Sequence, residues 1–224
     1  MSLHYETISP LLLSILKKLM SSDILKDFRL VGGTSLALQR GHRHSIDIDL
    51  FTDLQYGDMP IKDMRKYLEK TFPIYKGTET MDKDANGYHI YLSEGEMPLI
   101  KVDFFYTDPF IFPVIEKDGL RLADQREITA MKLLVIGGRT LRQKDFWDVH
   151  DMLEDYTLTE MIQWALKRDP YIVEEKDIIE GLRLIDEVQE SHEGIVSLKP
   201  LEYWELKILD LKEETEKYIK KMSV

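Results

Sequence analysis

Cysteine is absent from the chain of 224 residues. A disulfide framework, a thiolate metal site and a thiol nucleophile are therefore excluded, because each requires a cysteine sulfur. Long apolar runs are lacking too: no stretch approaches the roughly 18 residues of a membrane span, and the N-terminus has no basic segment followed by an apolar run. We therefore expect a cytoplasmic protein with neither a membrane nor a disulfide partner.

An excess of positive charge is also lacking. The formal net charge is -11, which argues against a protein that coats nucleic acid without specificity. The acidity is uneven, since residues 1–150 carry 20 Lys and Arg against 22 Asp and Glu, whereas residues 151–224 carry 10 against 19. Two basic stretches, Arg40 to His44 and Ile128 to Lys144, contain no acidic residue. A phosphate-bearing partner can therefore be bound locally.

Hydrophobic periodicity divides the chain near Asp124. Before it, strands of period two alternate with helices, and after it the apolar spacing is that of helices alone. The predicted strands are Phe28–Val31, Ile46–Phe51, Tyr88–Ser93 and Leu99–Tyr106. The predicted helices are Ser9–Met20, Thr34–Gln39, Ile61–Lys70, Gln125–Ile136, Lys144–Leu153, Leu158–Lys167, Asp177–Gln189 and Leu201–Lys220. We expect an α+β unit over residues 1–124 and an all-α unit over residues 125–224.

Two aspartates occupy one face of a predicted strand. Asp47 and Asp49 alternate with apolar residues, so both carboxylates point to one side while Ile46 and the other apolar residues face the core. Neighbouring carboxylates repel each other unless a cation lies between them, and hard oxygen ligands suit Mg²⁺. Asp103, on another predicted strand, is the best candidate for a third ligand. A half-exposed strand with an acidic face is the alternative that Asp-x-Asp alone leaves open.

A glycine pair, Gly32-Gly33, stands between a predicted strand and a predicted helix. Without side chains there, the backbone can approach a phosphate, and the helix N-terminus adds positive potential. Taken alone, the pair is more typical of a tight turn that needs positive φ. A phosphate held at these glycines would lie beside a metal held at Asp47 and Asp49, and this combination is more specific than either motif.

Together these motifs resemble the signature of the polymerase-beta-like nucleotidyltransferase superfamily, in which an apolar residue and a Gly-Gly or Gly-Ser pair precede Asp-x-Asp by about a dozen residues. Val31-Gly32-Gly33 and Asp47-x-Asp49 match that signature. More narrowly, the strings GGTSLAL and RHSIDIDLF are similar to the AbiEii/AbiGii toxin family, which includes the MenT toxins. The similarity covers about Leu30 to Leu153 and weakens between Asp53 and Leu99. It implies a mixed β-sheet core of the nucleotidyltransferase type.

The resemblance also implies roles for particular residues. The implied nucleotide-binding positions are Gly32, Gly33, Thr34, Arg43, Ser45, Lys132 and Arg139. The implied metal ligands are Asp47, Asp49 and Asp103. The implied catalytic positions are Asp47, Asp49, Asp103, Lys132 and Asp145. Further matches to the family's motifs are Lys101 before Asp103, and Glu127, Ala130, Lys144 and Asp148 around the helical positions.

Several of these positions have structural alternatives. Lys132 is typical of a lysine at the edge of a core as well as of a cation for a triphosphate. Arg43 is also typical of a solvated arginine in a loop, and Ser45 is equally typical of a residue that only forms hydrogen bonds within the loop. Asp145 is expected to orient Lys132 or Arg139, with Asp148 as a structural residue. Gly137-Gly138 departs from the family pattern and is expected to end a helix and redirect Arg139 and Arg142.

The reaction implied is the transfer of a nucleoside monophosphate from an NTP to an acceptor hydroxyl, with two Mg²⁺ ions or Mn²⁺. The family implies a tRNA 3′ end as acceptor, a role as the toxin of a toxin–antitoxin (abortive-infection) system, and a cognate antitoxin. Arg40, Arg43, Arg139, Arg142 and Lys144 are the candidates for a basic track along the RNA. The alternatives are an enzyme of the same fold that modifies a small molecule or a protein, and a catalytically inactive module that binds a nucleotide or a partner.

Overall fold

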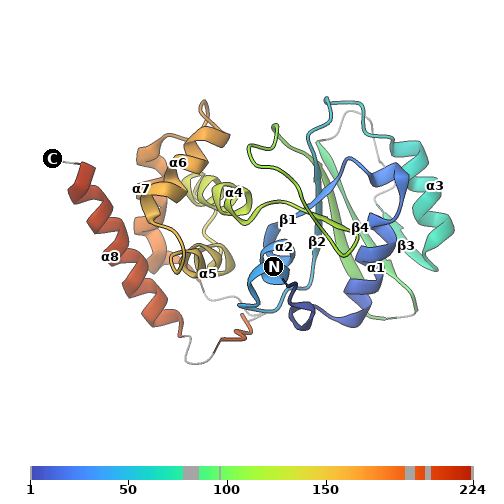
Figure 1. Ribbon diagram of the computed structural model, residues 1–224, viewed down its shortest axis with the longest axis horizontal. Helices are drawn as coiled ribbons and strands as arrows, with labels where there is room; N and C mark the ends of the chain where they lie inside the picture. The colour runs from blue at the N-terminus through green and yellow to red at the C-terminus, as the bar shows by residue number, and fades with distance from the viewer. Residues whose placement is uncertain (1, 78–85, 96, 190–194, 200–202, 223–224) are drawn as a thin grey trace. The chain divides into compact units, whose positions relative to one another are not determined.

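The computed structural model describes residues 2–77, 86–95, 97–189, 195–199 and 203–222. The chain divides into two compact units, unit 1 (Met1–Asp124) and unit 2 (Gln125–Val224), which Figure 1 shows. The sheet lies in unit 1, and unit 2 is built from helices. Among the described residues, none of the helices combines the length and the apolarity that crossing a lipid bilayer requires.

Seven strands form one mixed sheet in the described part of unit 1. They are β1 (Arg29–Val31), β2 (Ile48–Thr52), β3 (Ile74–Gly77), β4 (Gly87–Ser93), β5 (Ile100–Tyr106), β6 (Ile115–Lys117) and β7 (Leu120–Leu122). The order is β3-β4-β5-β2-β1-β7-β6, with β2 parallel to β5, β1 parallel to β7, and the other neighbours antiparallel. The predicted α+β class with a mixed sheet is confirmed.

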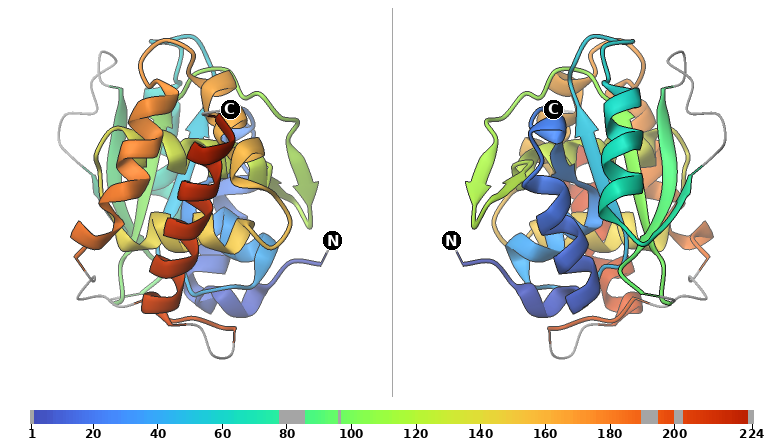
Figure 2. Two further views of the ribbon diagram at one scale, coloured as in Figure 1. Left: turned by 90° about the vertical axis from the view of Figure 1, so that its left-hand side faces the viewer. Right: turned by 90° about the vertical axis from the view of Figure 1, so that its right-hand side faces the viewer.

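Helices α1 (Pro10–Met20) and α3 (Ile61–Thr71) cover one face of this sheet, as the right-hand view of Figure 2 shows. The Ser9 hydroxyl accepts a hydrogen bond from Leu12 N at 3.1 Å and caps α1, whose first residue is a proline. The apolar side chains of α1 and α3 bury against those of the strands in one core. The buried members on β2, β4 and β5 are Ile48, Leu50, Tyr88, Ile90, Leu92, Ile100, Val102 and Phe104.

Helix α2 (Gly32–Arg40) begins two residues earlier than the sequence predicts, so the glycine pair forms its first turn. Strand β2 begins later than predicted, at Ile48, and Ile46 is 60% exposed instead of facing the core. The expectation for Ile46 is therefore wrong, because the chain joins the ladder only after Asp47. Strands β3, β6 and β7 were not predicted, since three or four residues are too few to show a period.

The five helices predicted for the C-terminal unit are all present. They are α4 (Gln125–Gly137), α5 (Gln143–Met152), α6 (Leu158–Arg168), α7 (Glu175–Arg183) and α8 (Trp204–Met222). The predicted helix Asp177–Gln189 starts earlier and closes as the 3-10 helix η3 (Leu184–Glu187), while residues 201–202 of the last predicted helix lie outside the described residues. Helix α4 contacts α5, α6 and α7. A Cβ at Gly181 would overlap the backbone oxygen of Ile136, so glycine is what lets α7 approach α4.

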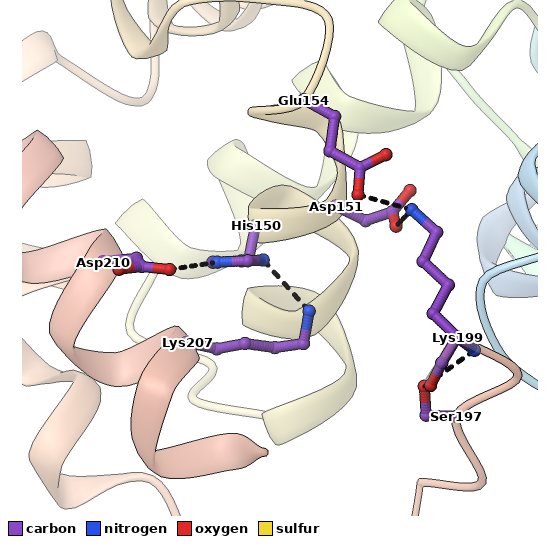
Figure 3. A network of polar contacts seen from close by, with 7 residues as sticks. All are labelled: His150, Asp151, Glu154, Ser197, Lys199, Lys207 and Asp210. Atoms are coloured by element: carbon purple, nitrogen blue, oxygen red, sulfur yellow. Dashed lines mark hydrogen bonds and ion pairs between the residues drawn. The ribbon is translucent and has the colours of Figure 1, made fainter. Parts of the chain in front are cut away.

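Polar contacts tie α8 and the segment before it to α5 (Figure 3). His150 Nδ1 lies 3.0 Å from Lys207 Nζ, and His150 Nε2 lies 3.1 Å from Asp210 Oδ2. The Lys207 ammonium also lies 4.5 Å from the centre of the Trp147 ring, a cation–π contact. Lys199 donates to Asp151 at 2.5 Å and to Glu154 at 2.7 Å. Lys199 thereby offsets one of the two negative charges of this acidic pair.

Candidate active site

Three polar side chains form one row across the sheet of unit 1. The register pairs Asp49 of β2 with Asp103 of β5, and Asp103 with His89 of β4. Their neighbours along each strand are buried in the core beneath α1 and α3, so alternation places this row on the opposite face. The structure therefore brings together two of the three predicted carboxylates and adds a histidine that sequence reasoning missed.

Asp103 is held by two partners. Its Oδ1 lies 2.7 Å from His89 Nδ1, and its Oδ2 accepts a hydrogen bond from Lys101 Nζ at 2.6 Å. Burial disfavours the charged form of Lys101, but the hydrogen bond to Asp103 and the charges of Asp103, Asp47 and Asp49 outweigh it and raise the pKa of Lys101. Lys101 is therefore an ammonium at neutral pH. Its positive charge partly offsets the negative charges of Asp47, Asp49 and Asp103.

The loop that carries Asp47 is bound to the start of α2. Thr34 Oγ1 is hydrogen-bonded to Ser45 Oγ at 2.8 Å and donates to the backbone oxygen of Asp47. Ser45 N donates to Thr7 O at 2.9 Å, which fixes the other side of the loop. Thr34, a predicted nucleotide-binding residue, is buried, so its hydroxyl serves here to position Asp47.

The glycine pair is pressed against the polar groups of the site. Gly32 has φ +65°, and a Cβ there would overlap the carboxylate of Asp49. A Cβ at Gly33 would overlap the guanidinium of Arg43, whose Nη1 donates to His44 O at 2.9 Å. The first turn of α2 thus contacts both an aspartate and an arginine. Its backbone N–H groups can donate hydrogen bonds to a phosphate there.

A divalent cation fits this donor set in a specific way. Within the described residues, no three His, Cys, Asp or Glu side chains are grouped closely enough to hold a metal. The two oxygens of Asp103 are engaged by His89 and Lys101. Asp47 and Asp49 are the other two predicted ligands, and a Mg²⁺ site commonly takes one or two carboxylates and completes its shell with substrate phosphates. The residues fit a metal site whose remaining ligands are phosphate oxygens of the NTP. Asp103 as a third protein ligand stays a prediction.

We expect Gly32→Ala to weaken NTP binding at the predicted phosphate site. The new methyl group meets the Asp49 carboxylate and must also adopt positive φ, so NTP affinity should fall by at least about tenfold and the melting temperature should drop. Gly57→Ala is the matched control, because Gly57 has φ +93° but no atom lies within 4 Å of the position that a methyl group would take there. Isothermal titration with an NTP should separate the two variants; equal affinities would contradict the proposed phosphate site.

In unit 2, Lys132 of α4 lies between two carboxylates of α5. Its Nζ is 2.8 Å from Asp145 Oδ1 and 2.7 Å from Asp148 Oδ2, and Arg142 Nε donates to Asp145 Oδ2 at 2.6 Å. Burial opposes ionisation of Asp145, but the charges of Lys132 and Arg142 outweigh it and lower the pKa of Asp145. Asp145 contacts Lys132 as expected, and Asp148 belongs to the same buried cluster, which sequence reasoning did not foresee.

Two other positions of the helical motif, Arg139 and Glu127, form ion pairs with residues of other helices. Arg139 has φ +64° just after α4 and pairs with Glu180 of α7, so Lys132 is the one of the two expected partners that Asp145 contacts. The helix does end at Gly137, as the glycine pair predicts. Glu127 in the first turn of α4 is fully buried and pairs with Arg168 at the end of α6, a residue that sequence reasoning missed.

Comparison with known proteins decides the family. The model of the family "nucleotidyl transferase AbiEii toxin, type IV TA system" matches residues 14–209. The chain belongs to the AbiEii family. The resemblance expected from the sequence motifs is thereby confirmed, and the AbiEii chain is an NTP-dependent nucleotidyltransferase.

This AbiEii protein is also similar to individual known proteins. An uncharacterised protein of Aquifex aeolicus (strain VF5) is 28% identical over 169 residues, which cover 72% of this chain and 71% of that protein. A solved structure from Helicobacter pylori, assigned as a nucleotidyltransferase, superposes with a TM-score of 0.57 at 17% identity and covers 95% of this chain and 93% of that one. JHP933 of Helicobacter pylori gives a TM-score of 0.57 at 16% identity, over 98% and 93%. These two structures show that the fold is shared.

Proposed function

We propose that this AbiEii protein transfers a nucleoside monophosphate from an NTP to the 3′-terminal hydroxyl of a tRNA, in a reaction that depends on a divalent metal. The observation that carries the proposal is the pairing of Asp49 with Asp103 on adjacent strands, with Gly32 packed directly against the Asp49 carboxylate. The proposed cation site and the proposed phosphate site therefore adjoin each other. That adjacency is what a triphosphate substrate requires.

The described residues suggest the following chemistry. The triphosphate binds at the first turn of α2, where Arg43 lies over Gly33. The acceptor oxygen attacks the α-phosphorus in line, the bond to the β-phosphate oxygen breaks, and pyrophosphate leaves with that electron pair. Asp103 is the group that takes the proton of the attacking hydroxyl. A divalent cation bound at Asp47 and Asp49 would neutralise charge on the triphosphate and polarise the reacting oxygens.

The proposal of an RNA acceptor is supported by exposed cations at the start of α5. Arg142 and Lys144 are exposed there, and Arg139 is exposed close by in the chain. Such cations bind phosphates along a nucleic-acid backbone. Family membership supports a growth-inhibiting toxin that is countered by a cognate antitoxin, and we propose that it acts in the cytoplasm. We further propose, from the match to the family's motif, that Lys132 contacts the NTP.

The decisive experiment combines purified protein, total tRNA and Mg²⁺ with each of the four labelled NTPs in separate reactions. We expect label to enter RNA with the wild type and one preferred NTP, and not with the Asp47→Ala, Asp49→Ala double variant. Omission of Mg²⁺ with EDTA should abolish labelling, and Mn²⁺ should restore part of it.

Two other outcomes would each replace the proposal. NTP binding without incorporation into RNA would favour a small-molecule or protein acceptor, which can be sought with labelled NTP and a cell extract. A lack of NTP binding would indicate an inactive partner-binding module. Calorimetry with each NTP distinguishes these outcomes.

A further inference from the structure

The row next to the carboxylates is aromatic. This row lies two residues further along the strands than the row of Asp49, Asp103 and His89. It consists of Phe51 of β2, Phe105 of β5 and Gly87 of β4, which the register aligns. The ring centres of Phe51 and Phe105 are 5.7 Å apart, and those of His89 and Phe105 are 5.1 Å apart. A Cβ at Gly87 would overlap the Phe105 ring, so this ring lies against the bare backbone of β4. Phe105 is half-buried, and the side chain of His89 is 53% exposed.

The position of this aromatic row suits an acceptor rather than the triphosphate. The phosphate site lies at α2, which follows β1, and the sheet runs from β1 through β2 and β5 to β4. In an in-line transfer the attacking hydroxyl approaches the α-phosphorus from the side opposite the departing pyrophosphate. If the pyrophosphate leaves toward β1, the end of the acceptor that carries the attacking hydroxyl must approach over β5 and β4. Phe105 and His89 are the side chains that it meets there, next to Asp103.

Cations lie on the other side of the carboxylate row. The register aligns Lys101 of β5 with Tyr91 of β4, and Tyr91 with Lys76 of β3. Lys76 and Tyr91 are exposed. The cation row and the aromatic row thus flank the carboxylate row, and cations together with aromatic rings bind single-stranded RNA, because the cations contact the backbone and the rings stack on bases whatever their identity.

We propose that Phe105 and His89 form a stacking shelf for the 3′-terminal base of a single-stranded RNA acceptor, and that Lys76 and Tyr91 contact its backbone. This inference rests on the proposed function and specifies how the acceptor is held. The shelf positions the terminal hydroxyl near Asp103 and reads the base by its π face, so it tolerates any base at that position.

The test measures RNA binding without NTP, using the full chain and a fluorescently labelled single-stranded RNA with the sequence of a tRNA 3′ end. A second RNA lacks only its 3′-terminal base. The proteins are the wild type, Phe105→Leu, which keeps apolar volume but loses the π face, and Phe105→Tyr, which keeps the ring. We expect Phe105→Leu to weaken binding of the intact RNA by between about fivefold and a hundredfold, the usual range for one stacked base, and Phe105→Tyr to bind as the wild type does.

The truncated RNA makes the test specific for stacking. If the shelf holds the terminal base, removing the base and removing the ring delete the same contact, so the two losses must not add. Additive losses, or an unchanged affinity in Phe105→Leu, would overturn the shelf while the labelling experiment with the wild type still supports the function. If the wild type labels no RNA at all, the proposed function itself fails. The two failures are therefore distinguishable.

Discussion

Asp49→Asn is expected to lower the rate of nucleotidyl transfer by about three orders of magnitude without lowering the melting temperature. Asp49 lies opposite Asp103 in the register, and the charges of Asp47, Asp49 and Asp103 all act on Lys101. Asparagine keeps the shape of the side chain but removes one negative charge from a group of three. The site then attracts a divalent cation less strongly, while repulsion among the remaining carboxylates decreases.

The measurement for Asp49→Asn is a single-turnover transfer rate at saturating NTP, together with thermal unfolding and Mn²⁺ titration. Asp58→Asn is the matched control, because Asp58 is an exposed aspartate in the connection after β2 and should leave all three quantities unchanged. A metal affinity that stays at the wild-type value in Asp49→Asn would show that the metal is bound elsewhere. A fall in melting temperature equal to that of a core variant would make the activity loss uninformative about chemistry, and this outcome would contradict the repulsion argument.

The parts of the site that could be predicted are those encoded in short spacings. Alternation along one strand placed Asp49 opposite the core, and the apolar residues around Asp103 placed it on another strand with the same alternation. A glycine pair at the end of a strand predicted the beginning of a helix. The structure brings these elements together, with Gly32 against Asp49 and Asp49 opposite Asp103. Their roles in catalysis stay predictions until the variants are measured.

The remaining contacts depend on pairing between segments far apart in the chain. His89 is on a predicted strand, but its contact with Asp103 follows from the register between β4 and β5, which no local pattern reveals. The contact of the Phe105 ring with the backbone of Gly87 also follows from the register between β4 and β5. Asp148 lies three residues after Asp145, and only the packing of α4 on α5 shows that Lys132 reaches both. Buried ion pairs of this kind are set by tertiary geometry rather than by sequence spacing.

Lys132→Met is expected to destabilise unit 2 by about 3–5 kcal/mol, because it leaves two buried carboxylates with one fewer cation. Lys132 is 8% exposed at its side chain, Asp145 is 1% exposed and Asp148 is fully buried. Lys167→Met is the control, since Lys167 is an exposed lysine at the end of α6 and should change stability by no more than about 0.5 kcal/mol. Urea unfolding followed by the tryptophan fluorescence of unit 2 measures both.

The effect of Lys132→Met should depend on pH in a defined direction. The pKa of Asp145 is lowered in the folded wild type, so the carboxylate stabilises the protein above its unfolded pKa of about 4 and this contribution is lost as the pH falls through the lower folded value. Without Lys132, protonation of the buried carboxylates relieves the unpaired charge. The stability difference between wild type and variant should therefore be largest near neutral pH and shrink in acid.

A triple variant separates the structural role of Lys132 from a role at the NTP. Lys132→Met combined with Asp145→Asn and Asp148→Asn removes the cation and both charges that need it, so most of the lost stability should return, as it does when a buried ion pair is replaced as a whole. If Lys132 also contacts the triphosphate, the transfer rate stays low in this stable protein, because no substitution restores a positive charge. Recovery of stability and transfer together would show instead that Lys132 acts only as the partner of Asp145 and Asp148. The charge on the triphosphate would then be met by Arg43 and the metal.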